Sequence, residues 1–368
     1  MHKNDLDTPC LLLERSLFDR NLLLMRERAA VAGKALRPHA KTHKCSSIAR
    51  EQLSAGNCVG ICAAKVSEAY ALARAGIESI LITSPVTTPA KIELLLACAA
   101  ISRECLVVVD NLDNASQLNE AATGLPNRLP ILLDLDPEMG RTGIPFAEAP
   151  EFARRLTAMH NLSLQGIQCY AGHLQHLRNA EERRRESQRL MQKAAQVFRQ
   201  LQSEGIPLHI FTGTGTGTAS FDLEIPELTD IQVGSYCVMD AEYAAVENPE
   251  YLQFEQFCPA LTLATTVISN NHADHVTVDA GLKALYFTPD TPPRVVRQGL
   301  PLPGWRYEWF GDEHGALFFT GEKPALGQRF ELCLPHCDPT INLHDEIQVI
   351  NHGKLVDRWQ IDLRGKVF

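Results

Sequence analysis

The chain has 368 residues, of which 45% are hydrophobic and 21% charged, as is ordinary for a folded globular protein of about two domains. Its formal net charge of −9 excludes binding to nucleic acid through a basic surface. No apolar stretch reaches the roughly 18 residues that span a bilayer. The opening MHKNDLDTPC carries acids where a secretory signal needs an apolar core, so we expect a cytoplasmic protein without a membrane partner.

Short apolar runs alternate with helical patterns from residue 35 to about 245. Eight runs are predicted as strands: 35–41, 58–64, 79–84, 105–110, 130–136, 164–172, 208–213 and 231–237. The clearest helix is predicted at 179–205, where Asn179 can cap the start, Glu182 can complete a capping box and Gly205 suits the end. Eight strand–helix alternations predict a parallel (β/α)8 barrel. A Rossmann-like doubly wound sheet stays open, but no GxGxxG follows the first strand.

A β-rich pattern replaces this alternation after about residue 255. Period-two alternation and turn signals predict strands within 260–269, 275–281, 315–321, 329–335 and 346–362. We therefore predict an α/β protein in two domains, the (β/α)8 barrel at residues 16–250 and a mostly antiparallel β domain at 251–368. The opening segment, residues 1–15, is also strand-like, and the sequence leaves open whether it joins the β domain.

Eleven cysteines are scattered through these elements rather than spaced as a framework. Without an export signal we expect them to be reduced and mostly buried. The pairs Cys58/Cys62 and Cys333/Cys337 lack the two-residue gap of a zinc knuckle, so we predict no structural zinc site.

Chemically active side chains collect where the predicted barrel strands end, and the active site of such a barrel lies at the carboxyl ends of its strands. They are Lys41 after the first strand, Arg141 after the fifth, Tyr170 with His173 and His176 after the sixth, and Tyr236 in the last run. The loop TGTGTGT at 212–218 precedes the eighth strand. Its glycines and threonines expose backbone N–H groups and hydroxyls that suit a phosphate.

A phosphate loop and a lysine at the end of the first strand together suggest pyridoxal phosphate. This cofactor needs a cradle for its phosphate and a lysine amine for covalent attachment. The stretch RPHAKTHK at 37–44 offers both Lys41 and Lys44, and the chemistry alone does not choose between them.

RPHAKTHK resembles the cofactor-lysine motif of the D-threonine aldolase family, which has an alanine-racemase-like barrel. Nearly the whole chain is similar to this family. The matching motifs follow in the family's order: DTPCLLL (7–13), GICAAKVSEA (60–69), MGRTGI (139–144), GIQCYAGHLQH (166–176), TGTGTGTASFD (212–222), VGSYCVMDAEY (233–243), DAGLKA (279–284), DEHG (312–315) and HCDPTINLHD (336–345).

The resemblance implies roles for individual residues. Lys41 matches the lysine that bonds the cofactor, and Lys44 becomes its neighbour. His176 matches a histidine proposed as the base for the substrate hydroxyl. Lys41, His39, Arg141, Tyr170, Gly213, Thr214, Gly215, Thr216 and Tyr236 would contact the cofactor, with the loop residues on its phosphate.

His336 and Asp338 match the family's ligands of a divalent metal ion. On an extended segment, residues i and i+2 face the same way, so both side chains could share one ion while Cys337 points elsewhere. One nitrogen and one oxygen ligand suit manganese, magnesium or cobalt.

Two positions depart from the family pattern. The family's phosphate loop usually reads TGGGTGS, and here its middle glycine is Thr214, whose side chain could crowd the loop or donate its hydroxyl to the phosphate. Ala171 stands where aldolases often have a polar residue, and His173 supplies an imidazole two residues later. These departures affect the choice of substrate side chain rather than the cofactor.

The resemblance implies a pyridoxal-phosphate- and metal-dependent aldolase that cleaves D-threonine and related D-β-hydroxy-α-amino acids to glycine and an aldehyde. A D-serine or 3-hydroxyaspartate dehydratase, or a hydroxyaspartate aldolase, could use the same scaffold. A non-catalytic pyridoxal-phosphate-binding protein is a third hypothesis, although such proteins are generally a barrel alone. We expect a homodimer, because alanine-racemase-like barrels often build their active sites between two chains.

Overall fold

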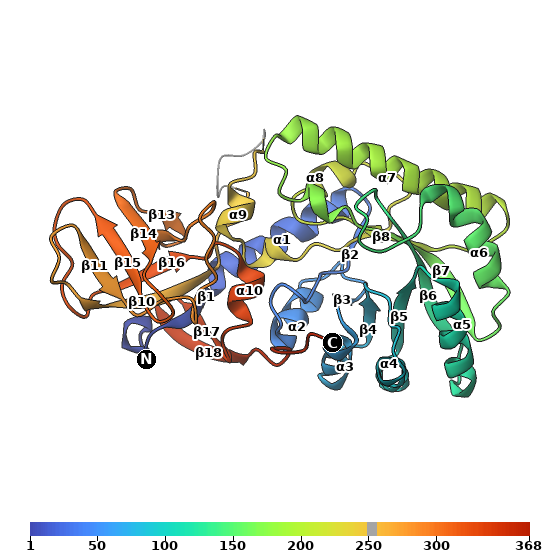
Figure 1. Ribbon diagram of the computed structural model, residues 1–368, viewed down its shortest axis with the longest axis horizontal. Helices are drawn as coiled ribbons and strands as arrows, with labels where there is room; N and C mark the ends of the chain where they lie inside the picture. Colours follow the sequence, from blue (N-terminus) through green and yellow to red (C-terminus); the bar gives the residue numbers. More distant parts are fainter. Residues whose placement is uncertain (249–255) are drawn as a thin grey trace. The chain divides into compact units, whose positions relative to one another are not determined.

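The structure, a computed structural model, describes residues 1–248 and 256–368 (Figure 1). The chain forms two compact units. The barrel unit comprises Met25–Lys41, Ile48–Gly234 and Gly365–Phe368, and the β unit comprises Met1–Leu24, Thr42–Ser47 and Ser235–Arg364. The expected boundary between residues 250 and 251 lies outside the described residues and stays a prediction. Within the described ranges, no helix has the length and apolar character needed to cross a membrane.

The barrel unit contains a sheet of eight parallel strands in the order β2-β9-β8-β7-β6-β5-β4-β3. Its strands are β2 (Ala35–Leu36), β3 (Ile61–Ala63), β4 (Ser79–Ile82), β5 (Glu104–Val109), β6 (Leu129–Leu135), β7 (Leu162–Cys169), β8 (Ile210–Gly213) and β9 (Asp230–Ile231). The two end strands also meet, because Leu36 and His39 form parallel bridges with Cys58 and Cys62. The sheet therefore closes, and the predicted (β/α)8 barrel is confirmed. Each predicted run overlaps one of these strands.

Helices alternate with the strands and lie outside them, as Figure 1 shows for α3 to α6. The helices from α1 to α8 are α1 (Arg15–Val31), α2 (Ser46–Ser54), α3 (Val66–Arg74), α4 (Pro89–Ile101), α5 (Leu112–Ala121), α6 (Ala149–Thr157), α7 (Ala180–Ser203) and α8 (Ala219–Asp222). The side chain of Asn179 caps α7 by accepting from the N–H of Glu182 at 2.9 Å. Gly205 follows the helix with a φ of +86°, where glycine is favoured. The predicted cap at Asn179 and the end at Gly205 are confirmed, but the capping box expected from Glu182 does not form.

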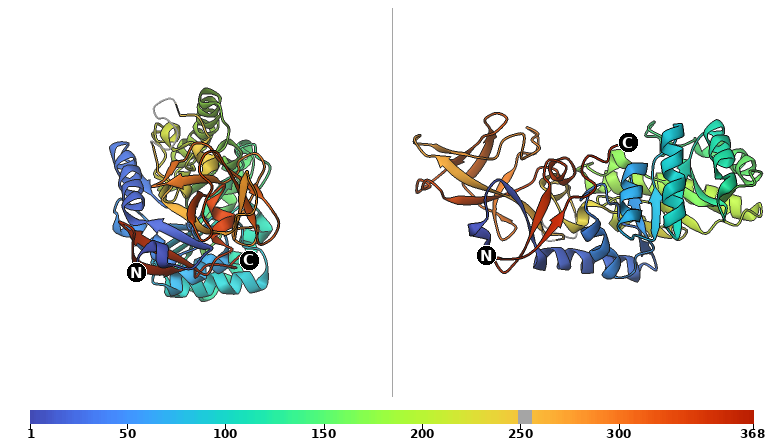
Figure 2. Two further views of the ribbon diagram at one scale, coloured as in Figure 1. Left: turned by 90° about the vertical axis from the view of Figure 1, so that its left-hand side faces the viewer. Right: turned by 90° about the horizontal axis from the view of Figure 1, so that it is seen from below.

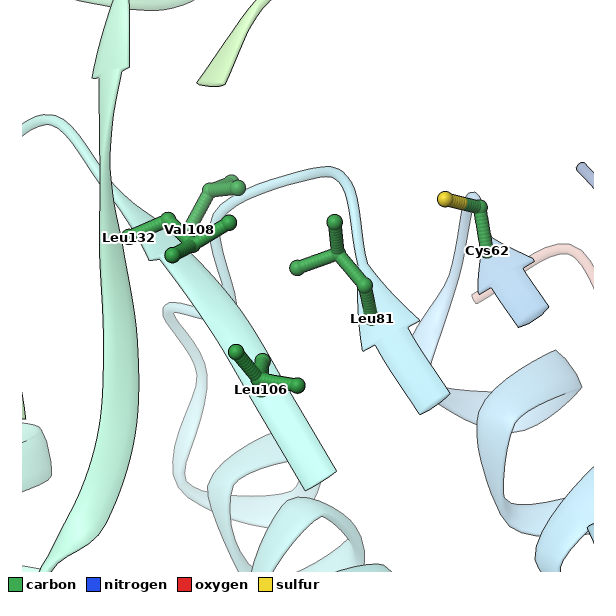
Figure 3. Close-up of a cluster of buried hydrophobic side chains, with 5 residues drawn as sticks. All are labelled: Cys62, Leu81, Leu106, Val108 and Leu132. Carbon is green, nitrogen blue, oxygen red and sulfur yellow. The ribbon is translucent and has the colours of Figure 1, made fainter. Parts of the chain in front are cut away.

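Apolar side chains fill the inside of the barrel. Cys62, Leu81, Leu106, Val108 and Leu132 form one buried cluster contributed by four adjacent strands (Figure 3). Ile210 of β8, which only β7 separates from β6 in the sheet order, also packs against the cluster, so five of the eight strands contribute to this core. All eleven cysteines of the chain are free and eight are buried, as predicted.

The β unit is built on a sheet of ten strands, mostly antiparallel. They are β1 (Cys10–Glu14), β10 (Leu261–Ser269), β11 (His275–Val278), β12 (Arg294–Arg297), β13 (Leu300–Pro301), β14 (Trp305–Trp309), β15 (Gly315–Phe319), β16 (Arg329–Cys333), β17 (Glu346–Asn351) and β18 (Lys354–Gln360). The N-terminal strand β1 lies between β10 and β17, antiparallel to the first and parallel to the second. In Figures 1 and 2 this blue strand lies among the orange and red strands. The opening segment thus belongs to the second sheet, which the sequence left open.

Candidate active site

Lys41 stands directly after the first barrel strand. Regular pairing is assigned to β2 only as far as Leu36, but the backbone continues the ladder. The N–H of His39 donates to the carbonyl of Val233 at 3.0 Å, and the N–H of Ala40 donates to the carbonyl of Cys62 at 2.8 Å. These bonds extend the strand to Ala40 and fix the backbone that carries Lys41 at the carboxyl end of the barrel.

A cavity of about 490 Å³ opens at this end of the barrel. It is lined by His39, Lys41, Ala64, Lys65, Thr83, Ser84, Pro85, Arg141, Thr142, Gln168, Tyr170 and Gln232. Its volume falls in the range of about 300–1,000 Å³ that is usual for small-molecule sites. The structure therefore brings together four of the predicted residues, His39, Lys41, Arg141 and Tyr170.

Hydrogen bonds fix the ring of His39 beside Lys41. The backbone N–H of Lys41 donates to Nδ1 of His39 at 3.4 Å, and Nε2 of His39 lies 3.1 Å from the hydroxyl of Thr83. That hydroxyl donates to the carbonyl of Ala63, so it accepts from the ring. In this arrangement Nδ1 of His39 accepts from Lys41 and Nε2 donates to Thr83. Across the same cavity, Cζ of Arg141 lies 5.4 Å from the centroid of the Tyr170 ring, within the range of a cation–π contact.

A buried polar network supports the floor of the cavity. The amide of Gln168 donates to Oδ1 of Asp134 at 2.9 Å, and Gln232 donates to Oε1 of Gln168 at 3.0 Å. Thr142 donates to the other oxygen of Asp134 at 2.8 Å, and burial raises the pKa of this carboxyl to about 6. These residues were missed in the sequence. The available signal was a polar residue inside an apolar run, as in ILLDLD and GIQCY.

The glycine–threonine loop follows β8, and its residues are absent from the described lining of the cavity. Thr214 has a φ of +72°, a left-handed conformation that side chains disfavour. Its hydroxyl donates to buried Asp222 at 2.9 Å. The side chain of Thr214 therefore points into the protein and does not donate to a phosphate. No backbone carbonyl in residues 1–248 or 256–368 accepts from the N–H of Gly215. Gly215 is a buried residue, and a backbone N–H there without a backbone acceptor fits a loop that binds an anion.

Gly215 leaves no room for a side chain. A Cβ there would lie 2.4 Å from Oε1 of Gln175, and Gln175 is held by bonds to Ala171, Gly217 and Thr218. We expect Gly215→Val to displace the loop and lower phosphate affinity by about tenfold or more, since a lost bond to a charged group costs roughly 1.5–3 kcal/mol. Equilibrium titration with pyridoxal phosphate measures this. Gly124→Val is the matched control, because a Cβ there meets nothing within 4 Å; equal affinities would contradict the prediction.

Beside the loop residues, His176 and Tyr236 also lie away from the cavity lining. His176 is exposed in the segment between the 3-10 turn Gly172–Leu174 and α7, with His173 exposed nearby. Tyr236 is fully buried in the β unit, where its ring makes an edge contact with Phe257 at 6.0 Å between centroids. The catalytic role of His176 and the phosphate contact of Tyr236 both stay predictions.

The expected metal ligands His336 and Asp338 lie in the β unit at the start of α10 (Cys337–Ile341). The prediction that both stand on an extended segment is wrong. His336 is extended, but the helix begins at Cys337 and has Asp338 in its first turn. The two side chains still approach each other, with Nε2 of His336 and Oδ1 of Asp338 3.9 Å apart.

Further carboxylates surround His336. Its Nδ1 lies 3.0 Å from Oδ2 of Asp240 and 3.5 Å from Oε2 of Glu242, which flank and begin α9 (Ala241–Ala244). Burial opposes the charged ring, but Asp240, Asp338 and Glu242 together raise the pKa of His336 to about 9. Across the described ranges, no three His, Cys, Asp or Glu side chains are arranged as a metal site, so the ion stays a prediction.

Comparisons with known proteins agree with this architecture. Residues 14–242 match the family model "Alanine racemase, N-terminal domain", and residues 260–350 match "Putative serine dehydratase domain". The chain is 38% identical to a D-threonine aldolase of Arthrobacter sp, covering 98% of this chain and 93% of the relative. It is 33% identical to a 3-hydroxy-D-aspartate aldolase of Paracoccus denitrificans (strain Pd 1222), covering 100% and 94%.

A solved structure shows the same likeness over the whole fold. The crystal structure of D-threonine aldolase from Filomicrobium marinum superposes with a TM-score of 0.92 at 33% identity, covering 99% of this chain and 97% of the other. Sequence similarity, the closed barrel with its second β unit, and a lysine in the cavity at the carboxyl end of the strands point the same way. The chain belongs to the D-threonine aldolase family of carbon–carbon lyases.

Proposed function

We propose that this enzyme uses pyridoxal phosphate and a divalent metal ion to cleave D-threonine and related D-β-hydroxy-α-amino acids to glycine and an aldehyde. The observation that carries the proposal is the position of Lys41. It lines a cavity with Arg141 and Tyr170, in a chain 38% identical to a D-threonine aldolase. A lysine in such a cavity can bond a carbonyl cofactor covalently.

The residues present fit pyridoxal phosphate. Lys41 would supply the amine that bonds the cofactor, and Arg141 with Tyr170 would bound the same cavity. The loop 213–216 would hold the phosphate through backbone N–H groups, of which Gly215 has no backbone acceptor in the described chain. Gln168 and Gln232 are fixed beneath the cavity and keep its floor polar. When bound, the cofactor would withdraw electrons from the bond that breaks.

The donor set at His336 and Asp338 fits a hard divalent ion such as manganese, magnesium or cobalt. Oδ2 of Asp240, 3.0 Å from Nδ1 of His336, would orient the imidazole as carboxylate partners of ligating histidines commonly do. The ion would supply Lewis acidity toward the substrate's β-hydroxyl. Cys337 does not compete as a ligand, because its thiol is fully buried, donates to the carbonyl of Met239, and has a pKa raised well above its usual value by burial.

His176 is proposed to take the proton of the β-hydroxyl. His176→Asn is expected to lower kcat by about 10²- to 10⁴-fold, the usual contribution of a general base. Retention of pyridoxal phosphate should be unchanged, because the residue lies outside the cavity lining. Steady-state kinetics with D-threonine measure the effect, and His173→Asn is the matched control from the same exposed segment. Full turnover in His176→Asn would assign the proton transfer elsewhere.

A hydroxyaspartate aldolase is the second candidate. Lys65 is exposed at the cavity and, like Arg141, adds a positive charge that a second substrate carboxylate would favour. A D-serine or 3-hydroxyaspartate dehydratase is less well supported, because the D-threo-3-hydroxyaspartate dehydratase of Delftia sp. (strain HT23) is 24% identical to this chain, against 38% for the D-threonine aldolase of Arthrobacter sp. The second β unit argues against a non-catalytic carrier. A homodimer and a cytoplasmic location stay predictions from the sequence.

One assay separates these functions. The full-length protein, loaded with pyridoxal phosphate and manganese, is incubated with D-threonine, D-phenylserine, D-serine and D-3-hydroxyaspartate, and the products are identified. We expect glycine and an aldehyde from D-threonine. Preferential cleavage of hydroxyaspartate would select the second candidate, and pyruvate with ammonia from D-serine would select the dehydratase. Cofactor binding without any product would identify a carrier.

A further inference from the structure

A buried carboxylate lies behind the glycine–threonine loop. Asp222, the last residue of α8, is only 1% exposed. It accepts hydrogen bonds from three hydroxyls: Ser187 of α7 at 2.6 Å, Thr214 at 2.9 Å and Thr218 at 2.6 Å. No cation of the described chain forms an ion pair with it, and burial raises the pKa of its carboxyl to about 6. The three hydroxyls are therefore what stabilises this carboxylate in an apolar surrounding.

These bonds decide what the loop can offer a ligand. Each hydroxyl has one proton, so Thr214 and Thr218, by donating to Asp222, cannot also donate to a phosphate. The hydroxyl of Thr212 likewise donates to buried Asp230 at 2.6 Å. Three of the four threonines in TGTGTGT are thus turned toward the protein. Recognition of an anion falls to the backbone N–H groups, whose directions depend on the shape of the loop.

Hydrogen bonds to Asp222 hold the shape of the loop at Thr214 and at Thr218. Thr214 keeps a φ of +72°, which costs roughly 1–2 kcal/mol for a residue with a side chain and needs a fixed partner. Asp222 supplies that partner for Thr214 and, four residues later, for Thr218. Gln175 completes the support, because its Oε1 accepts from the N–H of Gly217 at 3.0 Å and its Nε2 donates to the hydroxyl of Thr218 at 3.1 Å.

We propose that Asp222 is a positioning residue, which shapes the backbone of residues 214–218 so that it recognises the phosphate of the cofactor. This inference rests on the proposed use of pyridoxal phosphate. A negative charge near an anion site opposes binding by itself, so the carboxylate acts through the loop and not by contact. Its loss should weaken recognition of the phosphate specifically. The rest of the cofactor is bound in the cavity around Lys41, from which Asp222 is absent.

The test compares two ligands on the full-length apoprotein, pyridoxal phosphate and pyridoxal, which differ only in the phosphate. In Asp222→Asn we expect the Kd for pyridoxal phosphate to rise about 10- to 100-fold, as for loss of bonds to a charged group. The Kd for pyridoxal should change by less than about twofold, and the visible absorbance of the lysine-bound ligand reports both. The matched control is Asp134→Asn, another buried carboxylate beneath the cavity; it should leave the ratio of the two Kd values unchanged.

Two variants of Thr214 keep the test decisive if Asp222→Asn folds poorly. Thr214→Val removes the hydroxyl but keeps the disfavoured φ, so it should lose phosphate discrimination as Asp222→Asn does. Glycine adopts that φ readily, so Thr214→Gly should retain more of the preference for pyridoxal phosphate over pyridoxal than Thr214→Val does. Equal loss of both ligands, or unchanged affinity for pyridoxal phosphate in folded Asp222→Asn and Thr214→Val, would overturn the inference. Failure of the wild type to bind pyridoxal phosphate would instead overturn the proposed function.

Discussion

Lys41→Ala is expected to abolish covalent attachment of pyridoxal phosphate and to lower aldol cleavage by more than about 10⁴-fold, as when a covalent catalyst is removed. The reason is geometric as well as chemical. The barrel ladder continues through Ala40, so Lys41 stands at the carboxyl end of the strands beside the ring of His39.

Borohydride reduction of the loaded enzyme, followed by peptide mapping, measures the attachment directly. The label should lie on Lys41 in the wild type and be absent in Lys41→Ala. Lys65→Ala is the matched control, because Lys65 is another amine at the same cavity and should leave the label in place. A label on Lys44, Lys65 or Lys283 would show that the attachment site has been misassigned.

The barrel could be predicted from the sequence because its strands are buried on both faces. Buried parallel strands give continuous apolar runs, and eight such runs were visible. The ends of the elements were harder to predict. In the run 35–41 only residues 35 and 36 are assigned to a strand, and a single bridge at His39 continues the pairing. In the β unit, β12 to β14 were missed, because RVVR and WRYEW carry charges that interrupt the apolar pattern.

The cavity could be predicted only in part. Lys41, His39, Arg141 and Tyr170 sit at strand ends, and strand ends meet at one edge of a barrel. Their supports were invisible, because the bonds of Gln168 to Asp134 and of Asp222 to Ser187 join residues more than 30 positions apart. The position of Thr214 could be predicted from the loop, but the direction of its hydroxyl could not, since that depends on Asp222.

The segment around His336 shows how a local rule failed. Alternation on a strand placed His336 and Asp338 on one side, but HCDPT carries signals of a helix start. An acid in the first turn is favoured by the helix dipole, and Pro339 is tolerated there. The two side chains approach each other across the start of a helix instead. His336 is the extended N-cap residue, and Asp338 lies in the first turn that follows it.

Removal of the metal ion is expected to have the second large effect. Chelation should lower cleavage of D-threonine by about 10²-fold or more, because Lewis acid stabilisation is worth several kcal/mol. The visible absorbance of the Lys41-bound cofactor should persist, since His336 and Asp338 belong to a different compact unit of the chain from Lys41. Manganese, magnesium or cobalt should restore activity, and inductively coupled plasma analysis should find the ion in the active protein.

Asp338→Ala should lower cleavage of D-threonine as much as chelation does, and added metal should not restore the activity. The carboxylate is a hard oxygen ligand, so its loss leaves His336 with acidic neighbours but without the expected second ligand. Glu331→Gln is the matched control, a half-buried carboxylate of the same unit that pairs with Lys3 instead. We expect it to keep both metal content and activity. Cleavage of D-threonine at full rate by the chelated enzyme, or by Asp338→Ala, would exclude a catalytic metal. The carboxylates around His336 would then serve to hold its imidazolium as a structural cation.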